Sequence, residues 1–227
     1  MRAHTVLLFD IDGTLVTTGG AGRRAMDRAF EVLTGRGDAT HFPFAGMTDR
    51  AIVRAGLVHV GHDDDDASIE RLLSLYVELL EQEVSSATEY AVYPGIIRAL
   101  DAALGADHTA IGLGTGNLRR GARIKLSKVE LYERFAFGGF GCDHEDRAQL
   151  LRTGAERGAE LFGRPLGECR VVVIGDTVRD VDAGLAIGAD VVAVGTGGEE
   201  LAVLRTRGAH FVFRDLDEPG AIEALLG

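Results

Sequence analysis

The sequence predicts an α/β protein: a doubly wound parallel sheet with a small all-helical domain inserted into it. Three observations lead to this prediction. Short apolar runs that end near Gly or Asp are typical of buried parallel strands, helical patterns separate these runs, and one long segment shows helical periodicity only. At 227 residues the chain is long enough for one α/β domain and a smaller appendage.

Five apolar runs are predicted strands: Val6–Phe9, Ala110–Leu113, Val171–Ile174, Val191–Val194 and Phe211–Phe213. β-branched residues in the third and fourth runs favour strand over buried helix. The predicted helices among them are Gly95–Leu104, Asp146–Phe162, Val181–Ile187 and Glu218–Leu226. Strands that alternate with helices form a parallel sheet through right-handed crossovers, and ligands bind at the carboxyl ends of its strands.

Residues 16–92 interrupt this alternation, because they contain no convincing strand. Helical patterns cover Arg23–Leu33, Asp49–Val58 and Ala67–Val84, and the apolar residues of the last pattern share one face. The run Asp63–Asp66 is interpreted as a solvated helix start, where the helix dipole favours negative charge. We therefore predict a core domain of residues 1–15 and 93–227, and a helical cap domain of residues 16–92 above the end of the first strand.

Composition and charge restrict the classes of function. The formal net charge is −11, which argues against surfaces for nucleic acid or anionic membrane, since both need clustered Lys and Arg. The apolar stretch at the N-terminus is too short for a signal peptide or a membrane span. Cys142 and Cys169 have no spacing that indicates a disulfide framework or a zinc site. These observations favour a cytoplasmic protein. Monomer and homodimer both stay open.

Carboxylates follow the first and third predicted strands. Asp10 and Asp12 leave the first strand, and Gly13 after them permits a sharp turn. Asp176 ends the third strand and Asp180 lies one helical turn later. Two strands that bring acids to one edge can form an oxygen-only site of the kind that Mg²⁺ prefers. Acids in such positions also occur in ordinary turns and at helix caps, an interpretation that carries more weight for Asp176 and Asp180 than for the first pair.

The second predicted strand ends in Thr115, Gly116 and Asn117. A hydroxyl and glycine-flanked backbone N–H groups at a strand–helix junction can bind an anion. The glycine spacing fits neither the dinucleotide-binding fingerprint nor the nucleotide P-loop. We therefore interpret this loop as an anion site only in combination with the two acidic motifs.

Together, these segments resemble the haloacid dehalogenase superfamily, in its magnesium-dependent phosphatase branch with a helical cap, phosphoglycolate phosphatases among them. The resemblance covers essentially the whole chain and depends on the sequence DIDGT at Asp10–Thr14, on Thr115, and on GDTVRD at Gly175–Asp180. The order of these motifs and their places after apolar strands match as well. The resemblance implies the superfamily's α/β core, with residues 16–92 as its cap.

The resemblance also implies a role for each motif residue. Asp10 would be the nucleophile that forms an aspartyl-phosphate, and Asp12 the general acid and base. Mg²⁺ would be held by Asp10, the backbone carbonyl of Asp12 and Asp176, with Asp180 binding directly or through water. Thr115 and the N–H groups of Gly116 and Asn117 would hold phosphate oxygens.

The chain departs from the family at the motif that supplies a basic residue, usually Lys before Pro, because it contains no Lys-Pro pair. Arg147, before a helix at a matching distance, is favoured by its placement, and Lys125 is the competing residue. Either cation could neutralise the phosphate, Arg as a planar fork and Lys as a point charge.

In the predicted cap, the segment Phe44–Arg50 resembles the family's substrate-facing turn. Within it, Thr48 is expected to bind substrate, to cap a helix, or to do both.

The predicted function is hydrolysis of a phosphomonoester of a small metabolite, with phosphoglycolate-like or sugar-phosphate substrates first. Dehalogenases lack the acid present here as Asp12, and phosphonatases use a cap lysine, which residues 16–92 do not contain. A sugar phosphomutase stays open, since four cap arginines could anchor a second phosphate: Arg23, Arg24, Arg50 and Arg54. A receiver-like module that accepts phosphate without turnover is the alternative from another class, although such modules are shorter and have no helical insert.

Overall fold

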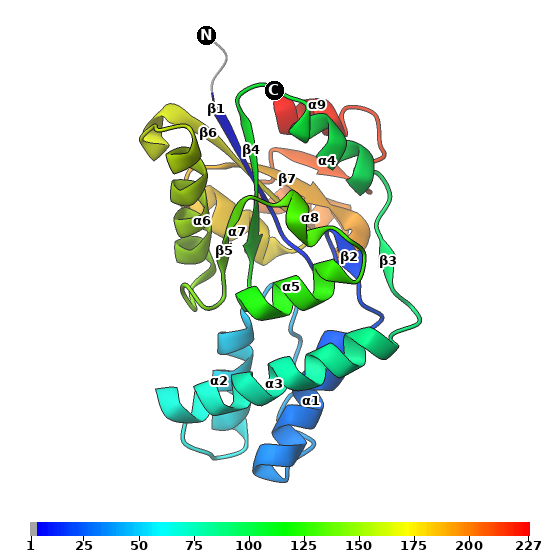
Figure 1. Cartoon of the computed structure of the whole chain (residues 1–227), viewed down its shortest axis with the longest axis vertical. Coiled ribbons are helices and arrows are strands. Elements are labelled where there is room, and N and C mark those ends of the chain that lie inside the picture. Colours follow the sequence, from blue (N-terminus) through cyan, green and yellow to red (C-terminus); the bar gives the residue numbers. More distant parts are fainter. Residues whose placement is uncertain (1–3) are drawn as a thin grey trace.

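The computed structural model describes residues 4–227 and contains a six-stranded sheet with helices on both faces (Figure 1). Residues 1–3 of the predicted core domain lie outside the described residues. All neighbouring strands pair in parallel, in the order β5-β4-β1-β6-β7-β8. The strands are β1 (His4–Phe9), β4 (Thr109–Thr115), β5 (Phe137–Phe140), β6 (Cys169–Gly175), β7 (Asp190–Val194) and β8 (Phe211–Phe213). The predicted doubly wound α/β fold is confirmed.

Strand β1 lies at the centre of the sheet, between β4 and β6. Its Leu8 pairs with Gly112 of β4 and with Val173 of β6. The three strands that carry polar motifs at their ends are therefore neighbours, and the chain turns from one side of β1 to the other between them. In doubly wound sheets such a switch point is where ligands bind.

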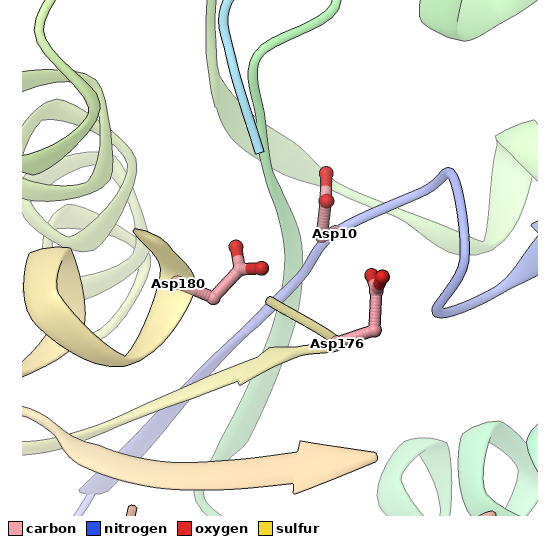
Figure 2. A group of neighbouring side chains, drawn as sticks. All are labelled: Asp10, Asp176 and Asp180. Atoms are coloured by element: carbon pink, nitrogen blue, oxygen red, sulfur yellow. The ribbon is translucent and has the colours of Figure 1, made fainter. Parts of the chain in front are cut away.

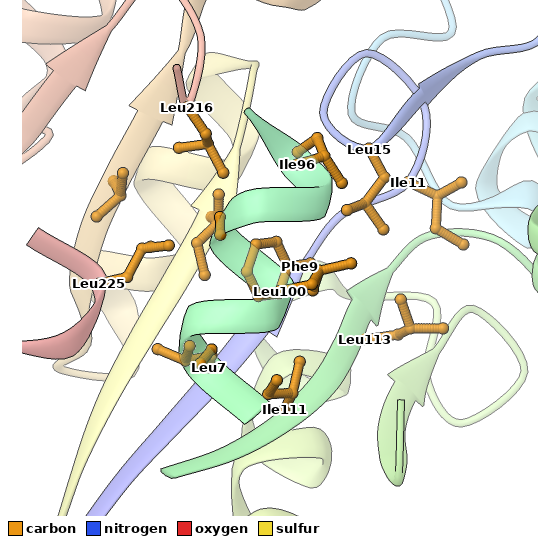
Figure 3. Packing of buried hydrophobic residues seen from close by; sticks show 14 of the residues in the cluster. Leu7, Phe9, Ile11, Leu15, Ile96, Leu100, Ile111, Leu113, Leu216 and Leu225 are labelled. Carbon is orange, nitrogen blue, oxygen red and sulfur yellow. The ribbon is translucent and has the colours of Figure 1, made fainter. Parts of the chain in front are cut away.

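The alternation of side chains along β1 gives the sheet its two covered faces. Val6 and Leu8 point to one face and pack with residues of α6 (Arg147–Leu161) and α7 (Val178–Ala186). Leu7 and Phe9 point to the other, against α4 (Ile96–Leu104) and α9 (Ala221–Leu226), as Figure 3 shows. Leucines in such a core each stabilise the fold by about 2–5 kcal/mol relative to alanine. This packing on both faces of the sheet gives the ends of the strands a rigid support.

Three helices, α1 (Ala21–Thr34), α2 (Asp49–His59) and α3 (Asp66–Ser86), lie together beyond the end of the sheet that α5 (Arg119–Ser127) also borders (Figure 1). They share a hydrophobic cluster of their own. Helix α3 starts where the acidic run ends, because the Asp65 side chain accepts a hydrogen bond from the Ser68 N–H at 2.8 Å. We call these three helices, with the loops between them, the helical segment.

Two short strands, β2 (Val16–Thr17) and β3 (Ala91–Val92), pair antiparallel at the two ends of the helical segment. The expectation that residues 16–92 contain no strand is therefore wrong at its margins. Two residues per strand are too few for a recognisable alternation. The division into core and cap domains remains our proposal.

The other differences from the sequence-based prediction have local causes. Strand β5 was not predicted because Gly138 and Gly139 interrupt its apolar pattern, yet a Cβ on Gly139 would lie 1.9 Å from the Leu150 carbonyl oxygen, so α6 can pack closely only against glycine. Helices α5 and α8 (Leu201–Arg207) were also not predicted. Helix α7 begins three residues before its predicted start because Thr177 caps it, and α9 begins only at Ala221, after Gly220.

No helix among those described is both long and apolar enough to cross a membrane.

Candidate active site

Three buried carboxylates meet at the ends of β1 and β6. Each of Asp10, Asp176 and Asp180 offers one oxygen, and these oxygens lie within 4.8 Å of one another (Figure 2). The pairing of Phe9 with Ile174 brings Asp10 and Asp176 to the same edge. Asp180 comes from the first turn of α7, where its carboxylate accepts from the Thr177 N–H at 3.0 Å. The sequence places an acid at each strand end, and the sheet register brings them together.

The pKa values of this cluster show the cost of burying several acids together. Burial raises the pKa of Asp10 to about 6; Arg147 opposes this rise, and the charges of Asp180 and Asp12 add to it. Burial and the charge of Asp180 also raise the pKa of Asp176 well above its usual value. Because an uncompensated buried carboxylate is unfavourable, the cluster favours a bound cation.

Arg147 is the cation that the structure places at this cluster. It is the first residue of α6 and is nearly buried, with its Nη2 2.9 Å from Asp10 Oδ2 and 2.5 Å from Asp180 Oδ1. Its Nε donates to the same Asp180 oxygen at 2.9 Å. Its Nη1 reaches the helical segment and donates to the Gly46 carbonyl at 3.3 Å. The guanidinium therefore connects the nucleophile candidate with α7 and with the loop before α2.

Lys125 lies next to Asp12 instead. Its buried ammonium donates to Asp12 Oδ2 and to Asn117 Oδ1, both at 2.6 Å. The Asn117 amide in turn donates to Asp12 Oδ2 at 2.8 Å and to the Thr115 hydroxyl at 2.9 Å. Of the two competing cations, Arg147 thus lies beside Asp10, and Lys125 fixes the carboxylate of Asp12.

The anion loop after β4 contributes in two ways. Thr115 is fully buried, and its hydroxyl, hydrogen-bonded to Asp10, lowers the pKa of that carboxyl against the effect of burial. Gly116 and Asn117 line a cavity that Asp10 also lines. A Cβ on Gly116 would lie 2.4 Å from the Met47 carbonyl oxygen, so glycine is needed where this loop meets the helical segment.

This cavity lies between the sheet edge and the helical segment and has a volume of about 400 Å³. Asp10, Asp12 and Asp176 line it from the sheet side. From the helical segment it is lined by Arg23, Met26, Phe44, Met47, Ile52 and Tyr76, among others. A cavity of this size holds a small molecule. Three of its lining carboxylates come from the sheet side, and Asp49 of α2 adds one from the helical segment.

The donor set fits a hard divalent cation. Asp176 accepts from the Thr14 hydroxyl through Oδ1 at 2.8 Å, and no other hydrogen bond to it is recorded in residues 4–227. Both carboxylate oxygens of Asp180 already accept hydrogen bonds, Oδ1 from Arg147 and Oδ2 from Thr177. Oxygen ligands from Asp10, Asp176 and the Asp12 carbonyl are the type that Mg²⁺ prefers, and Asp180 suits a contact through water.

Thr48 is an N-cap. Its hydroxyl accepts from the Ala51 N–H at 3.2 Å and donates to the Glu145 carbonyl at 3.0 Å. It is not among the residues that line the cavity. Its hydrogen bonds therefore support the helix-cap interpretation rather than a contact with substrate.

Three of the four arginines considered for a second phosphate are paired with carboxylates on the surface of the helical segment and the loop after β5. Arg24 pairs with Glu83, Arg50 with Asp66 and Glu70, and Arg54 with Glu145 and Asp64. None of these three lines the cavity, whereas Arg23 does.

Sequence reasoning missed several residues at this site. Asp49 is buried, accepts from the Leu118 N–H at 2.8 Å and is hydrogen-bonded to Tyr76. Nothing in its pattern distinguishes it from an ordinary residue of a first helical turn. Gly197, on the loop after β7, leaves no room for a Cβ, which would lie 1.7 Å from Asp176 Oδ2. Here a signal existed, because glycines follow a predicted strand at the same edge of the sheet.

The family model described as haloacid dehalogenase-like hydrolase matches residues 4–188. The chain belongs to this family. The prediction of an enzyme of the haloacid dehalogenase superfamily is thereby confirmed, and the chain is a hydrolase of that family. No curated protein matches it in sequence.

Solved structures with the same fold cover nearly all of this haloacid dehalogenase-like hydrolase. A hydrolase from Pseudomonas syringae has 22% identity and a TM-score of 0.70, over 95% of both chains. A mutant of CbbY from Rhodobacter sphaeroides, in complex with xylulose-(1,5)bisphosphate, has 18% identity and a TM-score of 0.75, over 99% of both. A protein described as a predicted phosphoglycolate phosphatase, from Haemophilus somnus, has 14% identity and a TM-score of 0.66, over 96% of both. At these identities the likeness establishes the fold.

Proposed function

We propose that this haloacid dehalogenase-like hydrolase is a Mg²⁺-dependent phosphatase that hydrolyses the phosphomonoester of a small metabolite. The observation that supports it most is the carboxylate of Asp10 in a small cavity, with Arg147 at one of its oxygens and a second carboxylate, Asp12, two residues away. One carboxylate can attack phosphorus there while the other transfers a proton.

In the proposed reaction an Asp10 oxygen attacks the phosphorus of the ester. The bond from phosphorus to the ester oxygen breaks, and the leaving alkoxide takes the proton of Asp12, which begins the cycle as a protonated carboxyl group. Asp12 then accepts a proton from a water molecule that attacks the same phosphorus. The bond between Asp10 and phosphorus breaks, which restores the Asp10 carboxylate and releases inorganic phosphate.

Asp10, the carbonyl of Asp12 and Asp176 would hold the Mg²⁺, with Asp180 contributing through water. When bound, the ion neutralises the charge that would otherwise keep an anionic nucleophile from an anionic phosphate. Arg147 would act in the same direction as a planar donor to phosphate oxygens. The N–H groups of Gly116 and Asn117 would hold the remaining oxygens.

Lys125 has a different proposed role from the phosphate-binding role considered first. Because its ammonium contacts Asp12 and Asn117, it would hold the Asp12 carboxylate in the position for proton transfer. We propose it as a positioning residue. Asp12 itself is about half exposed toward the cavity, which suits a group that meets substrate and water in turn.

The similar structures are in line with a phosphorylated substrate, since CbbY was solved with xylulose-(1,5)bisphosphate. A phosphoglycolate-like ester or a sugar phosphate remains our first expectation. We further propose a cytoplasmic protein without nucleic-acid or membrane partners, because the net charge of −11 disfavours anionic surfaces. A sugar phosphomutase and a non-turnover phospho-acceptor are the alternatives.

A panel of phosphorylated metabolites and p-nitrophenyl phosphate, assayed with Mg²⁺ and after chelation, tests the proposal. Release of phosphate that needs Mg²⁺ and disappears in Asp10→Asn is the expected result, because Asn keeps the shape but not the charge. Stable phosphorylation without phosphate release would favour the phospho-acceptor, and interconversion of hexose phosphates would favour the mutase. Hydrolysis that survives Asp10→Asn would overturn the assignment of the nucleophile.

A further inference from the structure

The part of the cavity formed by the helical segment contains a cation that has no acidic partner among the residues that the structure describes. Among residues 4–227, three basic residues line the cavity: Arg23, Lys125 and Arg147. Lys125 pairs with Asp12, and Arg147 with Asp10 and Asp180. Within residues 4–227, no carboxylate oxygen lies within 4.0 Å of the Arg23 side-chain nitrogens, whereas Arg24 and Arg28 on the same helix both pair with Glu83.

Neutral groups hold the Arg23 side chain in place. Its guanidinium carbon lies 4.0 Å from the centre of the Phe44 ring, and its nitrogens donate to the carbonyls of Thr40 at 2.7 Å and Phe42 at 3.0 Å. Stacking and carbonyl contacts fix a guanidinium without neutralising its charge. Its Nε donates to no acceptor among the described residues. The Arg23 guanidinium is therefore held in position by neutral groups, and none of these groups compensates its positive charge.

The surroundings of Arg23 add positive potential. It lies in the first turn of α1, whose N-cap Gly20 supplies no side-chain hydrogen bond and whose first turn has no acidic residue. Gly20 and Gly22, like Arg23, line the cavity. The positive end of the helix dipole therefore acts at the same place as the guanidinium. Met26 and Ile52 also line the cavity and carry no charge. The carboxylate of Asp49, which lines it from the helical segment, accepts from the Leu118 N–H and is hydrogen-bonded to Tyr76.

We propose that Arg23 is a specificity-determining residue that binds a second anionic group of the substrate, a carboxylate or a second phosphate, on the part that leaves as the alcohol. This inference rests on the proposed phosphatase function and narrows its substrate class. A phosphoryl group at Asp10 leaves the rest of a small ester in the same cavity that Arg23 lines. A neutral ester would leave this guanidinium without an anionic partner.

Matched pairs of esters test this proposal. One pair is 3-phosphoglycerate and glycerol 3-phosphate, which differ in a carboxylate; the other is ribulose 1,5-bisphosphate and ribulose 5-phosphate, which differ in a phosphate. We expect the wild-type enzyme to prefer the doubly anionic member of at least one pair in kcat/KM, and Arg23→Met to lower that preference about 10-fold or more, the size of a lost charge-assisted hydrogen bond. The pair that responds tells which anion Arg23 binds.

The neutral esters supply the test against a purely structural role. If Arg23 only holds residues 40–44 in place, its replacement lowers kcat/KM for both members of a pair alike. If Arg23 binds the second anionic group, its replacement lowers kcat/KM for the doubly anionic member only. Arg28→Met, on the same helix but outside the cavity, is the control and should leave both preferences unchanged. Arg23→Lys should keep part of the preference.

A measurement on the wild-type enzyme covers the case in which Arg23→Met does not fold. Competition against p-nitrophenyl phosphate should show 3-phosphoglycerate or ribulose 1,5-bisphosphate binding more tightly than its singly anionic counterpart. Hydrolysis of p-nitrophenyl phosphate without any preference in either pair would overturn the role of Arg23 and leave the phosphatase proposal intact. If no ester is hydrolysed at all, the phosphatase proposal fails, and this inference fails with it.

Discussion

The contacts of Asp12 fit the proton transfer that we propose for this residue. Its Oδ2 accepts from the Lys125 ammonium at 2.6 Å and from the Asn117 amide at 2.8 Å. Both donors are buried, while Asp12 reaches the cavity. A carboxylate held from one side by two fixed donors has a defined position toward the substrate, which is what a proton donor to a leaving alkoxide needs.

Replacement of Lys125 by Met should therefore harm poor leaving groups most. We expect kcat/KM for an alkyl phosphate to fall about 10- to 100-fold, because general acid catalysis contributes roughly 10²–10⁴-fold. For p-nitrophenyl phosphate, whose phenolate leaves without a proton, the fall should stay below about 3-fold. Lys128→Met, the only other lysine position, is the control. An equal fall for both esters would argue against the positioning role.

Arg147 has a positive charge that the fold needs, because buried acids surround it. Its guanidinium bonds to both Asp10 and Asp180, so Arg147→Met leaves these buried carboxylates without their cation. Breaking a buried pair in this way costs about 3–5 kcal/mol, and we expect that loss in the free energy of unfolding of the metal-free protein, measured with urea. Saturating Mg²⁺ should restore more stability to the variant than it adds to the wild-type protein.

The control for this experiment is Arg157→Met. Arg157 lies on the same helix and pairs with Asp143, but its side chain is about one-third exposed and away from the three-carboxylate cluster. Its loss should be smaller, and Mg²⁺ should not reverse it. An Arg147→Met variant with unchanged stability and no added response to Mg²⁺ would contradict the idea that the cluster is short of positive charge.

At the scale of elements, the start of α2 connects the helical segment with the anion loop. The Asp49 N–H donates to the Gly116 carbonyl at 2.8 Å, and the Asp49 carboxylate accepts from the Leu118 N–H at 2.8 Å. The neighbouring Thr48 donates to the Glu145 carbonyl. These bonds hold the helical segment on the loops that follow β4 and β5, so the cavity lies between two parts that are joined at the site itself.

The buried Asp49 makes this junction sensitive to pH. Burial raises its pKa from 3.8 to about 6, against the opposing effects of Lys125 and the Leu118 N–H. A raised pKa in the folded state means that the folded protein binds the proton more tightly, so its contribution to stability is complete below about pH 4 and is lost as the pH rises through 6. Ionised Asp49 therefore weakens the junction.

The variant Asp49→Asn cannot lose a proton, so its stability relative to wild type should rise between pH 4 and pH 7.5. The rise should reach about 1–3 kcal/mol, the equivalent of a shift of roughly two pKa units. Urea unfolding at both pH values measures it, and titrating groups that do not interact with Asp49 cancel in the difference. Asp38→Asn is the control, because Arg36 lowers the pKa of the partly exposed Asp38 to about 2, below this range. A pH-independent difference for Asp49→Asn would contradict the burial of its charge.

At the scale of the whole molecule, the sequence was sufficient for the fold class and for the strands that carry the site. Asp10, Thr115 and Asp176 each follow a dense apolar run, and parallel strands bring their ends to one edge. The family motifs supplied the expected roles. Strand β5 was missed because glycines replace its side chains, and these glycines make sense only with α6 packed on them. Propensity along the chain contains no information on such a contact.

The site's finer arrangement depends on contacts between distant segments, and the sequence could not supply these. Placement favoured Arg147, but only the structure separates its contact with Asp10 from that of Lys125 with Asp12. The Asp49–Tyr76 contact joins two helices of the helical segment with α5 nearby, and its residues look like ordinary cap and core positions in the sequence. Long-range packing decides such details, and one sequence does not specify them.

The most direct test of the central claim is to isolate the phosphorylated enzyme. The protein is mixed with Mg²⁺ and an ester that it hydrolyses, and the reaction is quenched in acid within one turnover. The site of phosphorylation is then mapped by mass spectrometry. We predict one phosphoryl group per chain, on Asp10, and none in Asp10→Asn. A phosphoryl group on another residue, or rapid hydrolysis with no phosphorylated enzyme at any quench time, would contradict the account.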